Sequence, residues 1–166
     1  MKTQHFDTII IGSGTSAFYA AQRLSEAGRK VALIEKREFG GTCALRGCQP
    51  KKFLVANAEA VSQARQLVGR GIKAAPETDW QALQRLKNSF LDTIPERSFE
   101  GYRAAGITLL RGEARMISDR MVVVGNDRLE ADLEESWITG HRLFYIGVKG
   151  EENTSRLDRN ISRLKI

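Results

Sequence analysis

The chain has 166 residues, of which 42% are hydrophobic and 28% are charged, and its formal net charge is +6. This length accommodates one good hydrophobic core. No apolar run approaches the roughly 20 residues of a membrane span, and the first residues do not form a signal peptide. We therefore expect a globular protein of the cytoplasm that makes no contact with a membrane. The 26 basic residues are scattered among 20 acidic ones without a basic block or an aromatic stripe, which argues against nucleic acid as a partner.

A strand, a glycine turn and a helix are predicted at the start of the chain. The β-branched run from Phe6 to Gly12 is typical of a buried parallel strand. The next residues, Gly12-Ser13-Gly14-Thr15-Ser16-Ala17, fit the pattern G-x-G-x-x-G/A. In this pattern Gly12 permits the tight turn, Gly14 lets a pyrophosphate approach the backbone, and Ala17 lets the following helix pack on the strand.

An acidic residue ends the next predicted strand, which spans residues 30–34. Glu35 lies 23 positions after Gly12, where a dinucleotide-binding unit places the carboxylate that holds a ribose. The glycine pattern alone is also compatible with an ordinary tight turn. Strand, glycines, helix, strand and acid in this order predict adenine-dinucleotide binding, and they do not by themselves separate FAD from NAD.

The two cysteines of the chain, Cys43 and Cys48, lie five positions apart between a glycine pair and a lysine pair. A disulfide requires Cα atoms about 4.4–6.8 Å apart, and a regular helix overshoots this over five residues, so we expect Gly47 and Pro50 to distort the chain. A helix start or the neighbouring lysines Lys51 and Lys52 favour the reactive thiolate. The pair is therefore predicted to be redox-active.

Two other interpretations of the cysteines are weaker. Two inert, small, apolar side chains would not require the flanking glycines and lysines. A zinc site requires four ligands, and neither His5 nor His141 has a suitable spacing, so no metal site is predicted.

Helices and a second β-unit are predicted in the middle of the chain. The apolar periodicity predicts a helix from Phe53 to about Val68 and another after Asp79, which is a candidate cap. The simplest interpretation of the apolar positions of the second helix is that they form core: Trp80, Leu83, Leu86, Phe90, Leu91 and Ile94. Residues 107–112 are predicted to return to the parallel sheet, and residues 115–131 to form a β-meander.

The glycine turn and the cysteine segment together resemble the class I pyridine nucleotide–disulfide oxidoreductases, the family of glutathione reductase, dihydrolipoamide dehydrogenase and mercuric reductase. The match lies in Gly12–Glu35 and in the specified positions of Gly40–Lys52, with Leu45 and Lys51 departing from many members. The resemblance implies an α/β, Rossmann-like FAD-binding domain that carries a three-stranded β-meander. It also implies helices after the cysteines that support the flavin and contribute to a homodimer.

The resemblance assigns roles to individual residues. Cys43 is expected to attack the substrate, Cys48 to form a charge-transfer contact with the flavin, and Lys52 to lie near the reactive nitrogen, so these three form the predicted catalytic set. Thr42 is expected close to the flavin, and the backbone at Gly112 close to the adenine. The full predicted cofactor set is Gly12, Ser13, Gly14, Thr15, Ser16, Ala17, Glu35, Lys36, Gly41, Thr42, Cys43, Gly47, Cys48, Lys52, Gly112 and Ala114.

The likeness to the family is expected to end near Asp132, so residues 1–132 are predicted as the N-terminal part of the FAD domain and 133–166 as an atypical tail. Ile138-Thr139-Gly140 is either a shifted form of a family motif or a coincidence, and 142–147 are a candidate strand. The family's NAD(P)H domain, its later Gly-Asp segment and its C-terminal dimer domain with a His-Glu pair have no counterpart in the sequence. The chain is accordingly expected to be a fragment, a truncated or frameshifted product, or a domain that works with another polypeptide.

Two functions follow from these expectations. In the first, FAD passes electrons from NAD(P)H to a Cys43–Cys48 disulfide and then to a small disulfide, a related sulfur substrate or a metal ion. In the second, the chain is a non-catalytic remnant that binds FAD weakly or not at all. Activity of the 166-residue chain alone is not expected. An NAD-binding regulatory module would leave the cysteine segment unexplained.

Overall fold

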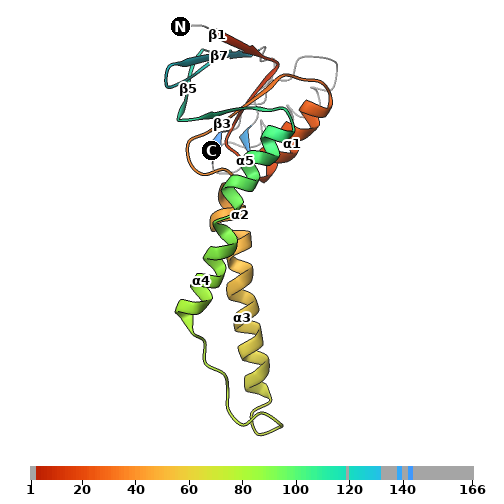
Figure 1. The fold of residues 1–166 in the computed structure, drawn as a ribbon, viewed down its shortest axis with the longest axis vertical. Helices are drawn as coiled ribbons and strands as arrows, with labels where there is room; N and C mark the ends of the chain where they lie inside the picture. Colours follow the sequence, from red (N-terminus) through yellow and green to blue (C-terminus); the bar gives the residue numbers. More distant parts are fainter. Residues whose placement is uncertain (1–2, 119, 132–137, 140–141, 144–166) are drawn as a thin grey trace, which may run out of the picture.

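The computed structural model describes residues 3–118, 120–131, 138–139 and 142–143. A parallel sheet lies between a pair of helices and a second sheet, and two further helices extend from this body as an arm (Figure 1). The predicted α/β class is confirmed. Among the described helices, none combines the length and the hydropathy of a membrane span.

The parallel sheet has the strand order β2-β3-β4, with β2 (Thr8–Ile11), β3 (Val31–Glu35) and β4 (Thr108–Arg111) all parallel. β-branched and leucine side chains fill both faces of its central strand, and residues 31–34 are all buried. The predicted return of residues 107–112 to this sheet is confirmed. Glu35 therefore ends the central strand, next to the glycine turn that follows β2.

The predicted first strand is divided at Asp7. The Asp7 carboxylate accepts a hydrogen bond from the Lys30 N–H at 2.6 Å, and the Asp7 N–H donates to the Lys30 carbonyl at 2.9 Å. These bonds anchor Asp7 at the entry to β3. The residues before it form a separate strand, β1 (Thr3–Phe6), which pairs in parallel with β7.

The second sheet contains the predicted three-stranded meander, which is confirmed as β5 (Ala114–Ser118), β6 (Met121–Val124) and β7 (Asp127–Ala131). Because β1 adds to its edge, the sheet has four strands in the order β1-β7-β6-β5. Val122 and Leu129 of this sheet pack with Ile9 and Ile34 of the parallel sheet in one buried cluster. The meander therefore covers one face of the parallel sheet.

Two helices cover the opposite face: α1 (Thr15–Glu26) and α5 (Ile94–Ala104). Ala17 and Ala21 of α1 pack with Tyr102 of α5 and with Ile10 and Leu33 of the sheet. The small alanines bring α1 close to the strands. The helix predicted after the glycine turn is thereby confirmed.

Along the chain, the cysteine segment (residues 40–52) and the helical arm lie between β3 and α5. The elements are α2 (Gly41–Arg46), α3 (Cys48–Gln66) and α4 (Trp80–Leu91). The predicted helix start at Phe53 is wrong by five residues: α3 begins at Cys48, because Pro50 falls in the first turn, where its missing N–H is not needed. The predicted Asp79 cap is confirmed, since its carboxylate accepts from the Ala82 N–H at 2.9 Å.

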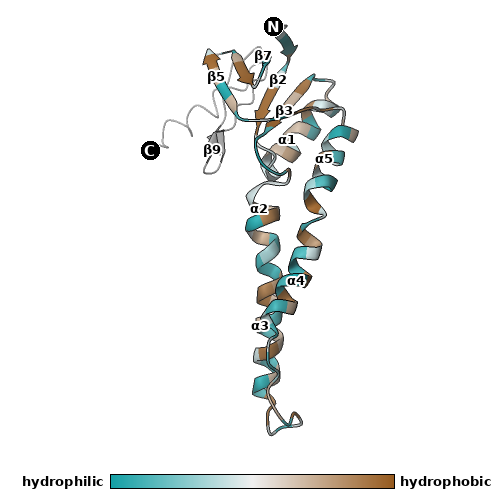
Figure 2. Cartoon of the chain, turned by 60° about the vertical axis from the view of Figure 1, so that its left-hand side comes forward, coloured by the Kyte–Doolittle hydropathy of each residue, from teal (hydrophilic) through white to brown (hydrophobic). Residues whose placement is uncertain are grey.

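The prediction that the apolar face of α4 lies entirely in the core is wrong. Trp80, Leu86 and Phe90 are 58%, 59% and 42% exposed, whereas Leu91 is buried. Because α3 and α4 run away from the sheets, only the end of α4 near α5 reaches the core (Figures 1 and 2). Apolar side chains of both helices therefore lie on the surface of the single chain.

The last described residues form a short antiparallel pair, β8 (Ile138–Thr139) with β9 (Arg142–Leu143). The predicted boundary at 132/133, Gly140 and most of the predicted tail lie outside the described residues. These interpretations stay predictions.

Candidate functional site

A glycine turn joins β2 to α1 at the carboxyl edge of the parallel sheet. Gly12 has a positive φ of 100°, and its N–H donates to the Ile34 carbonyl at 2.7 Å. Gly14 caps α1, which has no side-chain cap and no acidic residue in its first turn. A Cβ added at Gly14 would meet nothing within 4 Å. The amide groups at the start of α1 are thus open to an approaching anion.

Ser13 connects this turn to two other segments, and it is 2% exposed. Its N–H and its Oγ both donate to Oε2 of Glu35, at 2.9 and 2.7 Å. Its Oγ also accepts from the Gly40 N–H at 3.1 Å. A single serine therefore ties the turn to the end of β3 and to the start of the cysteine segment.

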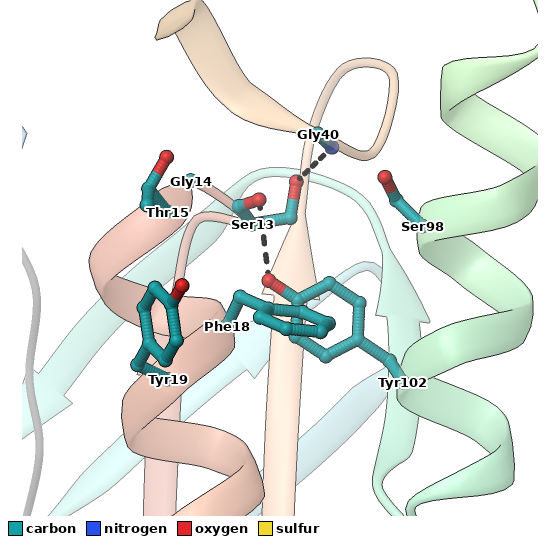
Figure 3. A pocket seen from close by; sticks show the side chains of 8 residues that line it. All are labelled: Ser13, Gly14, Thr15, Phe18, Tyr19, Gly40, Ser98 and Tyr102. Atoms are coloured by element: carbon teal, nitrogen blue, oxygen red, sulfur yellow. Dashed lines mark hydrogen bonds between the residues drawn. The ribbon is translucent and has the colours of Figure 1, made fainter. Parts of the chain in front are cut away.

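The carbonyl of Ser13 has a partner that sequence reasoning missed. The buried Tyr102 hydroxyl donates to it at 3.2 Å from α5, 89 positions away (Figure 3). Burial, followed by the nearby charge of Glu35, raises the pKa of the Tyr102 phenol well above its ordinary value. In the sequence Tyr102 differs in no way from an ordinary apolar position of α5, so no local signal pointed to it.

Glu35, the predicted ribose ligand, holds the chain itself in this structure. Besides the two bonds from Ser13 to its Oε2, its Oε1 accepts from the Arg37 N–H at 2.9 Å. An ionised carboxylate offers about four lone-pair directions, so acceptor capacity is left after these three bonds. In this structure Glu35 therefore holds Ser13 and Arg37 in place, and its binding of a ribose stays a prediction.

The cysteine segment lies directly on the glycine turn. Gly41 has a φ of 70°, and a Cβ added to it would come within 2.5 Å of the Gly14 Cα. Gly47 separates α2 from α3 with φ −127° and ψ −105°, and a Cβ there would lie 3.1 Å from the Thr42 carbonyl oxygen. The predicted break at Gly47 is confirmed, and it places Cys43 in α2 and Cys48 in the first turn of α3.

The two cysteine thiols are free and hydrogen-bonded to each other, Cys43 partly buried and Cys48 exposed. The hydrogen bond from Cys48 lowers the pKa of the Cys43 thiol, assisted by the Thr15 hydroxyl and the charge of Lys52 and opposed by burial. The same bond and the Cys43 charge raise the pKa of Cys48, against the charge of Lys51. Of the two thiols, Cys43 is therefore the one whose environment in this chain favours deprotonation.

Residues of the glycine turn and of the cysteine segment line two cavities. One, of about 170 Å³, is lined by Ser13, Gly14, Thr15, Phe18, Tyr19, Gly40, Ser98 and Tyr102 (Figure 3). The other, of about 290 Å³, lies between α3 and α4 and is lined by Lys52, Gln49, Phe53, Ala56 and Phe90. Lys52 thus faces an apolar cavity while its charge acts on Cys43.

Three further residues of the predicted cofactor set lie where β3 and β4 end: Lys36, Gly112 and Ala114. Lys36 and Glu113 form an ion pair at 2.8 Å, and the Gly112 N–H donates to the Glu35 carbonyl at 3.0 Å. A Cβ at Gly112 would lie 2.6 Å from a Val124 methyl group, so only glycine fits there. Ala114 begins β5 beside it.

Ser16 and Thr42 are exposed at the starts of α1 and α2. The described part of the chain holds no group of three His, Cys, Asp or Glu side chains that could bind a metal ion.

Comparisons with known proteins identify related sequences. The family described as pyridine nucleotide-disulphide oxidoreductase matches residues 6–162. Dihydrolipoyl dehydrogenase of Chlamydia pneumoniae is 38% identical over 128 residues, which are 75% of this chain and 28% of that protein. Glutathione reductase of Nostoc sp. is 28% identical over 131 residues, 78% of this chain and 28% of that protein.

A solved structure shares the fold. The HOCl-induced flavoprotein disulfide reductase RclA from Escherichia coli, solved as a Cu(II) complex, superposes with a TM-score of 0.61 and 27% identity, over 77% of this chain and 27% of that chain. The chain thus spans little more than a quarter of the length of these relatives.

Proposed function

Because the chain belongs to the pyridine nucleotide–disulfide oxidoreductase family, we propose that it binds FAD at the glycine turn and that Cys43 and Cys48 form a redox-active disulfide beside the flavin. The observation that carries this proposal is the contact between the cysteine segment and the glycine turn. Gly41 packs on Gly14, and the Thr15 hydroxyl reaches the Cys43 sulfur. A dinucleotide at the turn would therefore lie next to the thiols.

The residues at the turn fit such a group. The space above Gly14 is open, and the uncapped start of α1 presents free N–H groups and a partial positive charge to a pyrophosphate. Glu35 keeps acceptor capacity for a ribose hydroxyl, and the backbone at Gly112 and Ala114 lies at the neighbouring strand ends. Lys36 stands at the same edge of the sheet.

FAD, when bound, supplies two electrons that it receives from NAD(P)H. The Cys43–Cys48 S–S bond breaks as its two sulfurs accept these electrons and one or two protons. The Cys43 thiolate then attacks a disulfide substrate, which releases one substrate thiol. Cys48 next displaces the second substrate thiol from Cys43 and restores the protein disulfide. Lys51 and Lys52 stabilise the thiolate forms through their charge.

The whole reaction also requires an NAD(P)H site, which we propose by analogy with the full-length relatives. The substrate class is a small disulfide or a related sulfur compound, and a metal ion is an alternative acceptor. A homodimer is supported by the exposed apolar side chains of the arm, such as Trp80 and Phe90. Location in the cytoplasm stays a prediction.

Flavin uptake tests the cofactor proposal. The purified chain should bind added FAD, seen as a yellow protein fraction with altered flavin fluorescence. Gly14→Ala should fold within about 1 kcal/mol of the original chain, since its Cβ meets no atom. It should nevertheless lose FAD affinity at least about 100-fold, which corresponds to about 2.7 kcal/mol, because the methyl group occupies the open approach to the turn.

Gly101→Ala in α5 is the matched control, since its Cβ makes only an ordinary contact at 3.8 Å from the Phe18 ring. It should bind FAD like the original chain. A chain that takes up no FAD, or a Gly14→Ala variant that binds it unchanged, would refute the proposed cofactor site.

A second measurement tests the thiols. Gentle reduction of the FAD-loaded chain should produce a long-wavelength absorption shoulder, and Cys48→Ser should abolish the shoulder while FAD stays bound. If the shoulder persists in Cys48→Ser, the roles assigned to the two cysteines are wrong. Bound FAD without any thiol-dependent spectral change would favour the alternative of a non-catalytic FAD-binding remnant.

A further inference from the structure

Tyr102 of α5 lies where three segments of the candidate site meet. It is 1% exposed, and its hydroxyl donates to the Ser13 carbonyl at 3.2 Å (Figure 3). Its ring packs edge to face on Phe18 of α1, with 5.5 Å between the ring centroids. On another side the ring packs against Phe39, which precedes the cysteine segment. Tyr102 therefore contacts α1, the glycine turn and the chain that leads to the cysteines.

The hydroxyl of Tyr102 contributes an interaction that an aromatic ring alone does not provide. A phenylalanine would fill the same aromatic cluster without a polar atom, and a buried polar atom costs free energy unless it is hydrogen-bonded. Burial, followed by the nearby charge of Glu35, raises the pKa of the phenol, so the hydroxyl keeps its proton and remains a donor at neutral pH. Among the described residues, the acceptor of this hydrogen bond is the Ser13 carbonyl.

The bond to Tyr102 sets the direction of the peptide group between Ser13 and Gly14. This peptide is planar and trans, so its C=O and N–H groups point in opposite directions. Because the carbonyl points toward the buried hydroxyl, the Gly14 N–H points away from it. The bonds to Glu35 hold only the N–H and the Oγ of Ser13. They therefore leave the direction of the next peptide group to Tyr102.

The backbone of Gly14 permits the opposite direction as well. Its φ is −72°, and a half-turn of the peptide would bring this angle to a positive value, which glycine adopts readily. The turned peptide would direct the partial negative charge of the Ser13 carbonyl to the side that now carries the Gly14 N–H. A carbonyl in that direction repels an anion at the turn. The Tyr102 hydroxyl thus opposes a rotation that the glycine itself allows.

We propose that Tyr102 is a positioning residue of the dinucleotide site, whose hydroxyl holds the Ser13–Gly14 peptide in the direction that accepts a diphosphate. This role rests on the proposed function, because the diphosphate belongs to the bound dinucleotide. A site that adopts its binding form only part of the time binds its ligand in proportion to that fraction. Without the hydroxyl, the buried carbonyl lacks a partner, which disfavours the binding direction by about fivefold or more.

Calorimetric titration with ADP tests this role, since ADP carries a diphosphate without the flavin. Tyr102→Phe keeps the ring and removes only the donor, and it should raise the dissociation constant of ADP at least about threefold. FAD should be weakened by the same factor, because both ligands present a diphosphate to the turn. A variant with p-aminophenylalanine in place of Tyr102 returns an N–H donor to the same place, and it should restore most of the affinity.

The amide resonance of Gly14 in the NMR spectrum reports the direction of the peptide separately from the affinity. In the free chain, Tyr102→Phe should shift or broaden this resonance. Saturating ADP should then bring it to the position found in the original chain with ADP, because the ligand selects the same direction of the peptide in both. A role in packing alone would lower the melting temperature and would not make the two resonances converge when ADP binds.

Thr8→Val is the control variant. Thr8 is 1% exposed and begins β2, at the opposite end of this strand from the glycine turn. The substitution therefore removes a buried hydroxyl from the same core without touching Ser13. This variant should bind ADP like the original chain and keep the original Gly14 resonance.

The outcomes separate the positioning role from the proposed function. If ADP and FAD bind Tyr102→Phe as tightly as the original chain, the role of Tyr102 is refuted and the proposed cofactor site stands. The role is also refuted if the p-aminophenylalanine variant binds as weakly as Tyr102→Phe, or if Thr8→Val loses as much affinity. If the original chain binds neither ligand, the proposed function fails, and the role of Tyr102 fails with it.

Discussion

Ser13→Ala tests whether the glycine turn and the cysteine segment are held together through one hydroxyl. The substitution removes the 2.7 Å bond to the Glu35 carboxylate and the 3.1 Å bond from the Gly40 N–H. A hydrogen bond to a charged group contributes about 1.5–3 kcal/mol and a neutral one about 1 kcal/mol. Glu35 is only partly buried and still accepts the hydrogen bond from the Ser13 N–H in the variant. Water can therefore replace part of the hydrogen bonding that the substitution removes from Glu35.

The expected decrease in the free energy of unfolding is therefore about 2–3 kcal/mol, which lowers the melting temperature by about 4–12 °C for a chain of this size. Urea titration followed by circular dichroism measures it. Ser118→Ala is the matched control, because the exposed Ser118 Oγ accepts a long hydrogen bond from the Arg120 N–H at 3.4 Å, and it should change stability by less than about 0.5 kcal/mol. Equal stabilities of the two variants would refute the bridging role of Ser13.

Two further substitutions test the packing around this bridge. Tyr102→Phe should lower stability by about 1 kcal/mol at pH 7, through loss of the bond to the Ser13 carbonyl. Burial raises the pKa of the Tyr102 phenol, so on raising the pH the unfolded chain releases this proton before the folded chain does. Above the ordinary pKa of 10.0, the free energy of unfolding of the original chain should therefore fall by up to about 1.4 kcal/mol per pH unit relative to Tyr102→Phe. Equal dependence of the two stabilities on alkaline pH would contradict this. Gly41→Ala should lower the free energy of unfolding by at least about 2 kcal/mol more than Gly28→Ala does. Both glycines have a positive φ, but only a Cβ at Gly41 would meet backbone, 2.5 Å from the Gly14 Cα. Equal losses of stability in thermal melts would show that the cysteine segment does not rest on the glycine turn.

The glycine turn and the thiol pair could be located from the sequence because their signals are local. The strand, glycines and helix of the turn follow within a few residues, and two of the glycines meet a backbone requirement that the structure shows: the positive φ of Gly12 and the break at Gly47. The parallel return at 107–112 and the meander were predictable for the same reason, since alternation and turn residues encode them.

Predictions failed where the partner of a segment lies far away in the chain. The apolar periodicity of α4 is real, yet Trp80 and Leu86 are exposed, because periodicity identifies an apolar face without saying whether another element covers it. The division of the first strand at Asp7 depends on a hydrogen bond from the Lys30 N–H. No pattern within residues 6–12 predicts this division.

The sequence by itself determined that a glycine turn and a cysteine pair are present, because backbone geometry and thiol chemistry follow from residue type and spacing. Only the tertiary structure decided that they meet: that Ser13 joins Glu35, Gly40 and Tyr102, and that the Thr15 hydroxyl reaches Cys43. Such contacts join residues up to 89 positions apart. They depend on how the sheet, α1 and α5 pack together, and packing is a property of the whole chain rather than of any short stretch.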